Sequence, residues 1–361
     1  MALPMNSSIS ASERESRTWR RWLRRYAAST LAIAIAIAAA ILVLDPYDTG
    51  HFALFPGRGV PRYGQRLSAA SVARSPDIDA AIIGNSTVQL LDPRRISAAT
   101  RLNMVSLAVP GTGPQEQLAI AHWLLRWHPG PQLRAVVLGI DANWCNAEDG
   151  FAPSNPFPFW LYGDNRLDYA IHMMRFQSLD HALRKAQLLL GLASPERNFG
   201  YHDYDAGRQW TEAGFEAQLA SSDLVPWKTS AATRDFAALP LLSGFLRALS
   251  PQTAAVLVLP PVYRAALPDP GSPAEGRLEA CETALRTLAA ERPRTEVIDY
   301  LHDAELAGRN ENFFDSIHYR SPVARKIETE IATAATALMR ISLRLAPGPE
   351  LRDASGLAKA N

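Results

Sequence analysis

The chain has 361 residues, of which 47% are hydrophobic and 20% are charged, and its formal net charge is +1. This composition provides enough apolar material for a large core and excludes an intrinsically disordered chain. Six arginines against two glutamates make the first 26 residues basic, so the remainder is slightly acidic and nucleic acid is excluded as an expected partner.

An uncharged apolar segment follows this basic N-terminus. Residues 26–44 read YAASTLAIAIAIAAAILVL, which is long enough to cross a bilayer as a helix. The positive-inside rule places the preceding arginines in the cytoplasm. The sequence therefore predicts a basic cytoplasmic N-terminus over 1–25 and a single-pass transmembrane anchor over 26–44. With this topology, everything after Asp45 would lie outside the cytoplasm.

Three alternatives exist for this segment. A cleaved signal peptide, a twin-arginine signal at Arg20-Arg21 and a buried core helix share parts of the pattern. The uncleaved anchor is favoured because the apolar run exceeds an ordinary signal core and arginines flank it directly.

Residues 45–77 are rich in glycine, proline and arginine and predict an irregular tether. Five short apolar runs without alternation follow, and such runs are typical of strands that are buried on both faces of a parallel sheet. They lie at 80–83, 104–109, 135–140, 254–259 and 296–300. A helix is expected over 115–127, and another after Ser321 as N-cap and Pro322 as first helical residue. The fold class is thus α/β over 78–345, with a doubly wound, mainly parallel five-stranded sheet.

The segment from about 144 to 240 interrupts this alternation and predicts an insertion that caps one end of the sheet. It contains an aromatic and proline-rich stretch at 151–162 and a helical stretch at 166–191. The aromatic side chains could stack on a sugar, although ordinary packing onto the domain is favoured. Residues 346–361 predict a disordered tail.

Only two cysteines are present, Cys145 and Cys281. With the predicted topology they would face an oxidising compartment, where they could pair or remain as two buried thiols. The chain has neither a His-Glu-x-x-His nor a Cys-x-x-Cys motif, so no metal and no other cofactor is expected.

Polar residues follow several of the predicted strands. Ser86 comes after the first, in Gly84-Asn85-Ser86, and Asp315 and His318 lie in the loop after the fifth. The carboxyl ends of parallel strands meet at one edge of the sheet, where α/β proteins bind ligands. A serine nucleophile needs a base, and the base needs an orienting group. Each motif alone is also an ordinary turn. Their joint occurrence favours a triad.

The order of these motifs resembles that of the SGNH (GDSL-like) family of serine hydrolases and acyltransferases. Gly84-Asn85-Ser86 matches the Gly-Asp-Ser block with one substitution, Gly111 matches the glycine block, and Asp315 with His318 matches the Asp-x-x-His block. The resemblance covers roughly 78–145 and 254–340 and implies the flavodoxin-like SGNH fold. It also implies Ser86 as nucleophile, His318 as base and Asp315 as its orienting group.

The same resemblance implies an oxyanion hole made by the backbone N–H groups of Ser86 and Gly111 and the side chain of Asn143. The third block departs from the family pattern Gly-x-Asn-Asp, because Asn143 stands two positions late and Asp141 could occupy its place. An ionised Asp141 would be a poor oxyanion donor. Five further residues at these strand ends are expected to contact substrate: Asn85, Asp141, Trp144, Pro261 and Tyr319.

The resemblance implies an esterase or O-acyltransferase, tethered to the membrane, that acts on acyl esters of cell-envelope glycans, with acetyl as the expected acyl group. A transferase would need an acyl donor from across the membrane, which implies a membrane-bound O-acyltransferase as partner. The alternative is a catalytically inactive module of the same fold that binds an envelope glycan or a partner protein.

Overall fold

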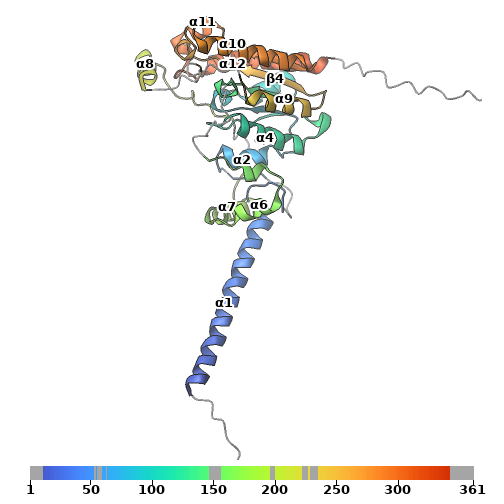
Figure 1. Ribbon diagram of the computed structural model, residues 1–361, viewed down its shortest axis with the longest axis vertical. Helices are drawn as coiled ribbons and strands as arrows, with labels where there is room; N and C mark the ends of the chain where they lie inside the picture. The colour runs from blue at the N-terminus through green and yellow to red at the C-terminus, as the bar shows by residue number, and fades with distance from the viewer. Residues whose placement is uncertain are drawn as a thin grey trace, which may run out of the picture.

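The computed structural model describes residues 11–52, 54, 59–61, 63–145, 156–195, 200–221, 227 and 235–341. These residues form one α/β domain that is carried on a long N-terminal helix (Figure 1). The predicted tail at 346–361 lies outside the described residues.

Five parallel strands form the central sheet, in the order β2-β1-β3-β4-β5. Their bounds are Ala80–Ile83 (β1), Met104–Ser106 (β2), Ala135–Gly139 (β3), Ala254–Leu259 (β4) and Thr295–Asp299 (β5). This is the doubly wound order whose direction reverses between β1 and β3. The predicted fold class of an α/β protein with a parallel five-stranded sheet is confirmed.

The second strand is shorter than its apolar run predicts, because regular pairing stops at Ser106. The chain nevertheless stays beside β1. The N–H of Leu107 donates to the carbonyl of Ile82 at 2.8 Å, and that of Val109 donates to Gly84 at 2.9 Å. These two hydrogen bonds hold the end of this segment next to the turn that carries Ser86.

Helices cover both faces of the sheet. The helices of at least eight residues that lie on or beside the sheet are α2 (Gln65–Val72), α3 (Pro93–Thr100), α4 (Pro114–Trp127), α9 (Ala238–Ala248), α10 (Pro273–Ala290) and α12 (Ser321–Arg340). Shorter turns of helix are η1 (Ser86–Val88), η2 (Gly130–Gln132), η3 (Ala142–Cys145), η4 (Arg264–Ala266), α11 (Ala304–Ala307) and η5 (Asn310–Asn312). One core cluster joins α3 and α12 to the face that Ile82 points to, and another joins α4, α9 and α10 to the face of Ile83.

The last helix shows how tertiary contacts replace a local cap. Val323, Ile327 and Ile331 form its buried stripe, as its apolar periodicity indicates. The N-cap position belongs to Arg320 rather than to the predicted Ser321. The Ser321 N–H is satisfied instead by a carboxylate oxygen of Asp205 at 2.8 Å. A residue from the insertion therefore caps α12.

The prediction of an irregular tether over 45–77 is wrong for the described residues of that segment. Asp45, Tyr47 and Asp48 are buried immediately after the N-terminal helix. The helix α2 packs on α4, where the indole N–H of Trp123 donates to the carbonyl of Ala70 at 2.9 Å. Asp45 accepts from the Thr49 hydroxyl and Asp48 from the Ser71 hydroxyl, both at 2.9 Å, so this part of the chain belongs to the folded domain.

The insertion does not form one cap at the end of the sheet, as the sequence predicts, but divides into two parts. Helices α5 (Phe159–Tyr162), α6 (Arg166–Met173) and α7 (Phe176–Leu189) lie between α2 and the N-terminal helix (Figure 1). Residues 200–221, with α8 (Glu212–Ser221), lie at the carboxyl end of the sheet. Within the aromatic stretch, Phe157 stacks on Tyr162 with ring centroids 5.1 Å apart, so these rings pack on each other.

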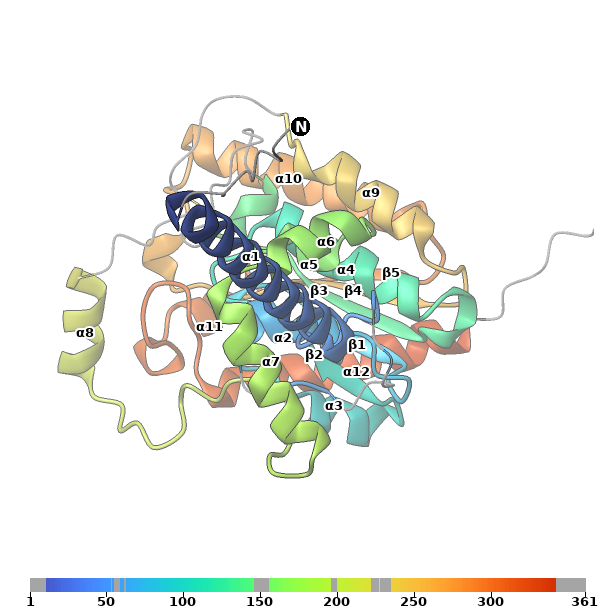
Figure 2. The same ribbon diagram turned by 90° about the horizontal axis from the view of Figure 1, so that it is seen from below.

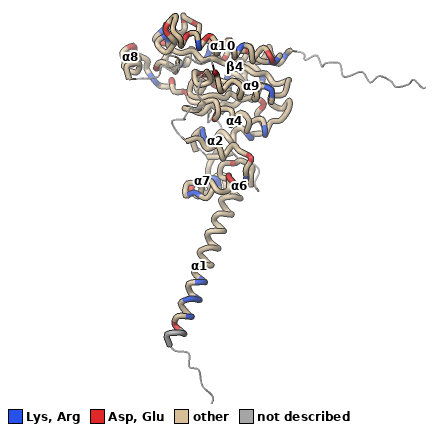
Figure 3. Tube along the Cα trace, viewed as in Figure 1, with Lys and Arg blue, Asp and Glu red and all other residues tan. Residues whose placement is uncertain are grey.

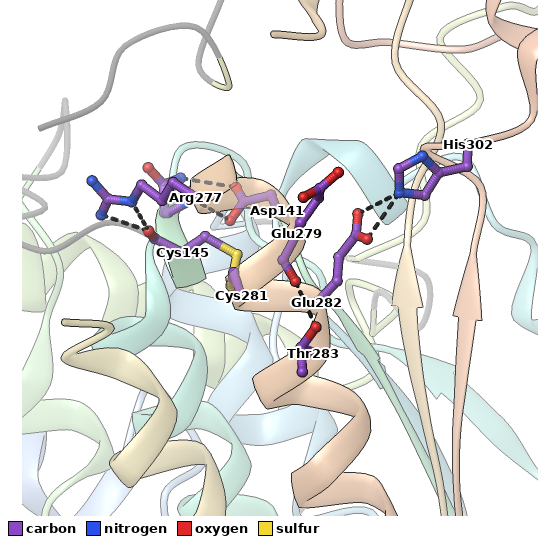
Figure 4. The surroundings of a disulfide bond; sticks show 9 residues. Asp141, Cys145, Arg277, Glu279, Cys281, Glu282, Thr283 and His302 are labelled. Carbon is purple, nitrogen blue, oxygen red and sulfur yellow. Dashed lines mark hydrogen bonds and ion pairs between the residues drawn. A yellow bond between two sulfur atoms is a disulfide. The ribbon is translucent and has the colours of Figure 1, made fainter. Parts of the chain in front are cut away.

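The N-terminal helix α1 (Ala11–Leu44) projects from the domain with its apolar side chains exposed (Figure 1). By length and composition it can cross a membrane. Its last turn enters the domain, where Ile41 is buried. The two cysteines, for which the sequence left two possibilities, form a disulfide bond between η3 and α10, with Cα atoms 5.7 Å apart (Figure 4).

Candidate active site

The turn that carries Ser86 depends on two glycines. A Cβ atom at Gly84 or at Gly139 would lie 2.5 Å from a methyl group of Val88. Val88 fills the space that the two glycines leave, and this allows η1 to fold tightly against β3. The turn therefore presents Ser86, which is half-buried, at the carboxyl end of β1.

The structure brings Ser86, His318 and Asp315 together across 232 positions of sequence. The Nε2 atom of His318 lies 2.9 Å from the Ser86 Oγ, and its Nδ1 atom lies 2.7 Å from Oδ2 of Asp315. Since an ionised carboxylate only accepts, Nδ1 carries the hydrogen and Nε2 is free to accept from the serine hydroxyl.

Asp315 is held in place by its own loop. Its Oδ1 atom accepts the backbone N–H groups of Ile317 and His318, both at 2.8 Å. Burial alone would raise the pKa of Asp315. The hydrogen bond and charge of His318, together with the two backbone N–H groups, outweigh this effect and hold the pKa of Asp315 below its ordinary value. The carboxylate is therefore ionised at neutral pH and can stabilise an imidazolium at His318.

The backbone N–H groups of Ser86 and Gly111 have no hydrogen-bond acceptor within the described part of the chain. Gly111 has a φ of +64°, a left-handed conformation that favours glycine. The Gly111 loop is fixed by Arg66 of α2, whose Nη2 lies 2.8 Å from the carbonyl of Pro110 and 3.3 Å from that of Gly111. Sequence reasoning missed Arg66, since nothing in the local sequence separates it from the other arginines of this segment.

The third segment holds Asp141 and Asn143 in one hydrogen-bonded group. Oδ2 of Asp141 accepts from the side-chain amides of Asn143, at 2.8 Å, and of Asn85, while Oδ1 accepts from the Asn143 N–H at 3.1 Å. Burial raises the pKa of Asp141 to about 6 against the opposing effect of these amides. Asp141 is thus an ionised acceptor at neutral pH. The amide of Asn143 keeps one hydrogen for another acceptor.

The far end of this segment is tied to α10. The carbonyl of Cys145 accepts from Nε of Arg277 at 2.9 Å and from its Nη2 at 2.7 Å, and the Cys145 side chain is bonded to Cys281 (Figure 4). A bidentate guanidinium contact and a covalent link therefore fix η3, the helical turn that carries Asn143.

A second contact that the sequence does not reveal comes from the insertion. The ring of Tyr204 meets that of His318 edge-on, with centroids 5.8 Å apart, and its hydroxyl donates to the carbonyl of Tyr319 at 3.0 Å. The adjacent Asp205 binds Arg320 at 3.1 Å and caps α12. Tyr204 and Asp205 stand in a polar stretch without a motif, so only the tertiary structure identifies them.

Three residues expected to contact substrate are buried in the structure. Trp144 is fully buried, with its indole N–H 3.2 Å from Oε1 of Gln117, and Tyr319 is fully buried as well. Pro261 is also buried, in a segment whose Tyr263 N–H binds the carbonyl of Ser316 at 2.9 Å. These three residues support the loops at the strand ends, and their contact with substrate stays a prediction.

No family model matches the chain, and no curated protein matches it. The chemical interpretation of this site therefore rests on its own geometry.

Proposed function

We propose that the protein is an SGNH-type serine esterase or O-acyltransferase that works through an acyl-serine intermediate. The observation that carries this proposal is the unbroken hydrogen-bonded chain from Asp315 through His318 to Ser86. The strand order of the sheet and the position of Ser86 at the end of β1 support the family likeness of the motifs.

In the proposed reaction, the Ser86 Oγ attacks the carbonyl carbon of an ester while Nε2 of His318 takes the hydroxyl proton. The ionised Asp315 stabilises the resulting imidazolium. The N–H groups of Ser86 and Gly111 and the remaining amide hydrogen of Asn143 are the available donors for the tetrahedral oxyanion. Collapse of this intermediate expels the alcohol, which receives its proton from His318.

The acyl-serine then transfers its acyl group. Water as acceptor gives an esterase, and a sugar hydroxyl gives a transferase, with His318 accepting the proton of the incoming group in either case. We infer acyl esters of cell-envelope glycans, acetyl esters in particular, as the substrate class. A transferase would receive its acyl group through a membrane-bound O-acyltransferase.

The proposed location is the periplasmic face of a bacterial inner membrane. The exposed apolar surface of α1 supports a membrane anchor, and the arginines before it support a cytoplasmic N-terminus. The disulfide between Cys145 and Cys281 supports an oxidising compartment for the domain.

Fluorophosphonate labelling of the full chain tests the proposal, since this probe reacts with activated serines. We expect labelling of the wild type and of His302→Ala, an exposed histidine outside the site, and no labelling of Ser86→Ala or His318→Ala. Absence of labelling in a folded wild-type protein would favour an inactive binding module. Turnover of p-nitrophenyl acetate would then show whether water can serve as acceptor.

A further inference from the structure

Two helices of the insertion turn their apolar sides outward. On α7, Phe176 and Leu183 are 86% and 60% exposed, and Leu190, directly after the helix, is 74% exposed. Their spacing of seven residues puts them on one stripe. The opposite side of α7 contains Ala182, Lys185 and Leu188, all buried. An ordinary surface helix buries such large apolar side chains, whereas here they share the exposed side with the ion pair of Asp180 and Arg184.

Helix α6 likewise exposes large apolar side chains. Leu167, Ile171 and Met174 follow one another at spacings of four and three and are all exposed, whereas Tyr169 and Met173 are fully buried. We call the exposed side chains of both helices the apolar platform: Leu167, Ile171, Met174, Phe176, Leu183 and Leu190. Exposed apolar patches of this kind mark an interaction site.

The platform helices are fastened to the chain that leaves α1. The hydroxyl of Tyr169 donates to Oδ1 of Asp45 at 2.6 Å, and the hydroxyl of Tyr47 lies 2.7 Å from Nδ1 of His181. Lys185 donates to the carbonyl of Gly59 at 2.6 Å. These contacts fix the height of the platform relative to the last turn of α1, beside which both helices lie (Figures 1 and 2).

The platform lies beside the C-terminal end of the apolar part of α1. Residues 26–44 extend about 28 Å as a helix, which matches a hydrocarbon core of about 30 Å. At the other boundary, Trp19, Trp22 and Tyr26 are exposed beside a group of arginines, which Figure 3 shows in blue at the far end of α1. Aromatic and basic residues are typical of a membrane–water interface. The second interface then falls at Leu44, next to the platform.

We propose that the apolar platform docks on the outer leaflet of the membrane that α1 crosses, with its side chains at the boundary between headgroups and acyl chains. The buried sides of α6 and α7 face the domain, so the platform faces back along α1. Exposed Arg166 and Arg175 beside it can reach lipid phosphates. In Figure 1 the domain layers stack away from this surface, so docking would hold the sheet at a fixed orientation to the membrane.

Depth measurement in lipid bilayers tests this proposal, which rests on the proposed membrane anchor. The native cysteines are bonded to each other, so a single introduced cysteine can be labelled selectively with a nitroxide. The full chain with Leu183→Cys is reconstituted in vesicles of phosphatidylethanolamine and phosphatidylglycerol. Thr333→Cys, an exposed position of α12, is the matched control.

We expect the Leu183 label to be more accessible to oxygen, which dissolves in acyl chains, than to a water-soluble nickel complex, and the Thr333 label to show the reverse. A Leu183 label as accessible to nickel as the control would overturn the proposal, because the platform would then lie in water. Low accessibility to both reagents with spin–spin broadening would overturn it in favour of a second copy of the chain.

Alkaline carbonate extraction of the same vesicles separates the two proposals. If the chain stays in the vesicles while its Leu183 label lies in water, the proposed anchor is supported and the proposed docking of the platform is overturned. A chain that is extracted overturns the anchor and the platform together, while the chemistry proposed for Ser86 is unaffected.

Discussion

Two histidines that follow β5, His318 and His302, each pair with a carboxylate, but their burial and their other neighbours differ. His318 lies 2.7 Å from Asp315, and His302 lies 2.8 Å from Glu282 of α10 (Figure 4). The His318 side chain is 21% exposed and has Ser86 on its other nitrogen, whereas that of His302 is 60% exposed. A histidine beside a carboxylate is thus not by itself evidence of a catalytic site. Partial burial and a serine at the end of a strand distinguish the first pair.

The cluster around His302 also has the composition of a metal site. Ligand atoms of Glu282, Asp299 and His302 lie within 4.8 Å of one another. Arg286 already binds Asp299 at 2.7 Å, so a cationic side chain supplies charge that a metal would bring. Hydrogen bonding to Glu282 raises the pKa of His302. We therefore interpret this cluster as ion pairs on the surface, and it provides matched controls for the site at Ser86.

Replacing the two histidines gives the largest contrast. His318→Gln is expected to lower kcat/KM for p-nitrophenyl acetate by at least about 10³-fold, because the serine loses its base. His302→Gln should stay within about twofold of the wild type. Equal losses in both variants, with unchanged circular dichroism, would contradict the comparison.

The carboxylates form the next pair of variants. Asp315→Asn removes the charge that stabilises the His318 imidazolium and is expected to lower kcat about 10²- to 10⁴-fold, with a much smaller change in KM. Glu282→Gln should leave both constants unchanged. Steady-state kinetics on the purified variants measure the difference, and an Asp315→Asn enzyme with full activity would show that His318 needs no orienting group.

The depressed pKa of Asp315 also predicts how this variant responds to pH. An ionised Asp315 stabilises the fold above its unfolded pKa of about 3.9, and this contribution is lost as pH falls through the lower folded value. The difference in unfolding free energy between wild type and Asp315→Asn should therefore shrink below about pH 4. Urea unfolding at pH 3 and pH 7 provides the measurement.

The proposed oxyanion donor allows a sharper test within the Ser86 site. Asn143→Ala is expected to lower kcat by about 10²- to 10³-fold. Asp141→Asn should cause part of the same loss, since Asp141 orients the Asn143 amide. In the double variant the two losses should not add, because they concern one hydrogen-bonded unit. Additive losses would mean that Asp141 acts independently of Asn143.

The smallest effect concerns stability at the other pair. Because Glu282 raises the pKa of His302, their interaction stabilises the fold below the ordinary histidine pKa of about 6.5 and is lost as pH rises through the raised value. His302→Gln should cost less than about 1 kcal/mol at pH 6, as for other exposed ion pairs, and nothing at pH 9. Urea unfolding at the two pH values tests this, and an equal cost at both would exclude an electrostatic origin.

Local sequence pattern was sufficient to predict most of the strands and two of the helices. Continuous apolar runs predicted β1, β3 and β4 within a residue of their observed ends, since burial on both faces leaves no alternation. The same logic predicted the parallel sheet, the apolar helix over 26–44 and the buried stripe of α12. It also placed Ser86, Asp315 and His318 at strand ends, because that position follows from the strands alone.

Which of these side chains lie in contact, and which residues hold their loops in place, depends on the tertiary structure. The contact between Ser86 and His318 depends on strand order and loop path, as does the disulfide between Cys145 and Cys281. Local pattern likewise gave no indication of Arg66 behind the Gly111 loop or of Tyr204 on His318. Helix α7 is the plainest case: its sequence predicted only a helical stretch, and contacts such as that of Lys185 with Gly59, in the chain after α1, accompany the burial of one side. Periodicity defines the faces of a helix, but the surroundings determine which face meets the domain.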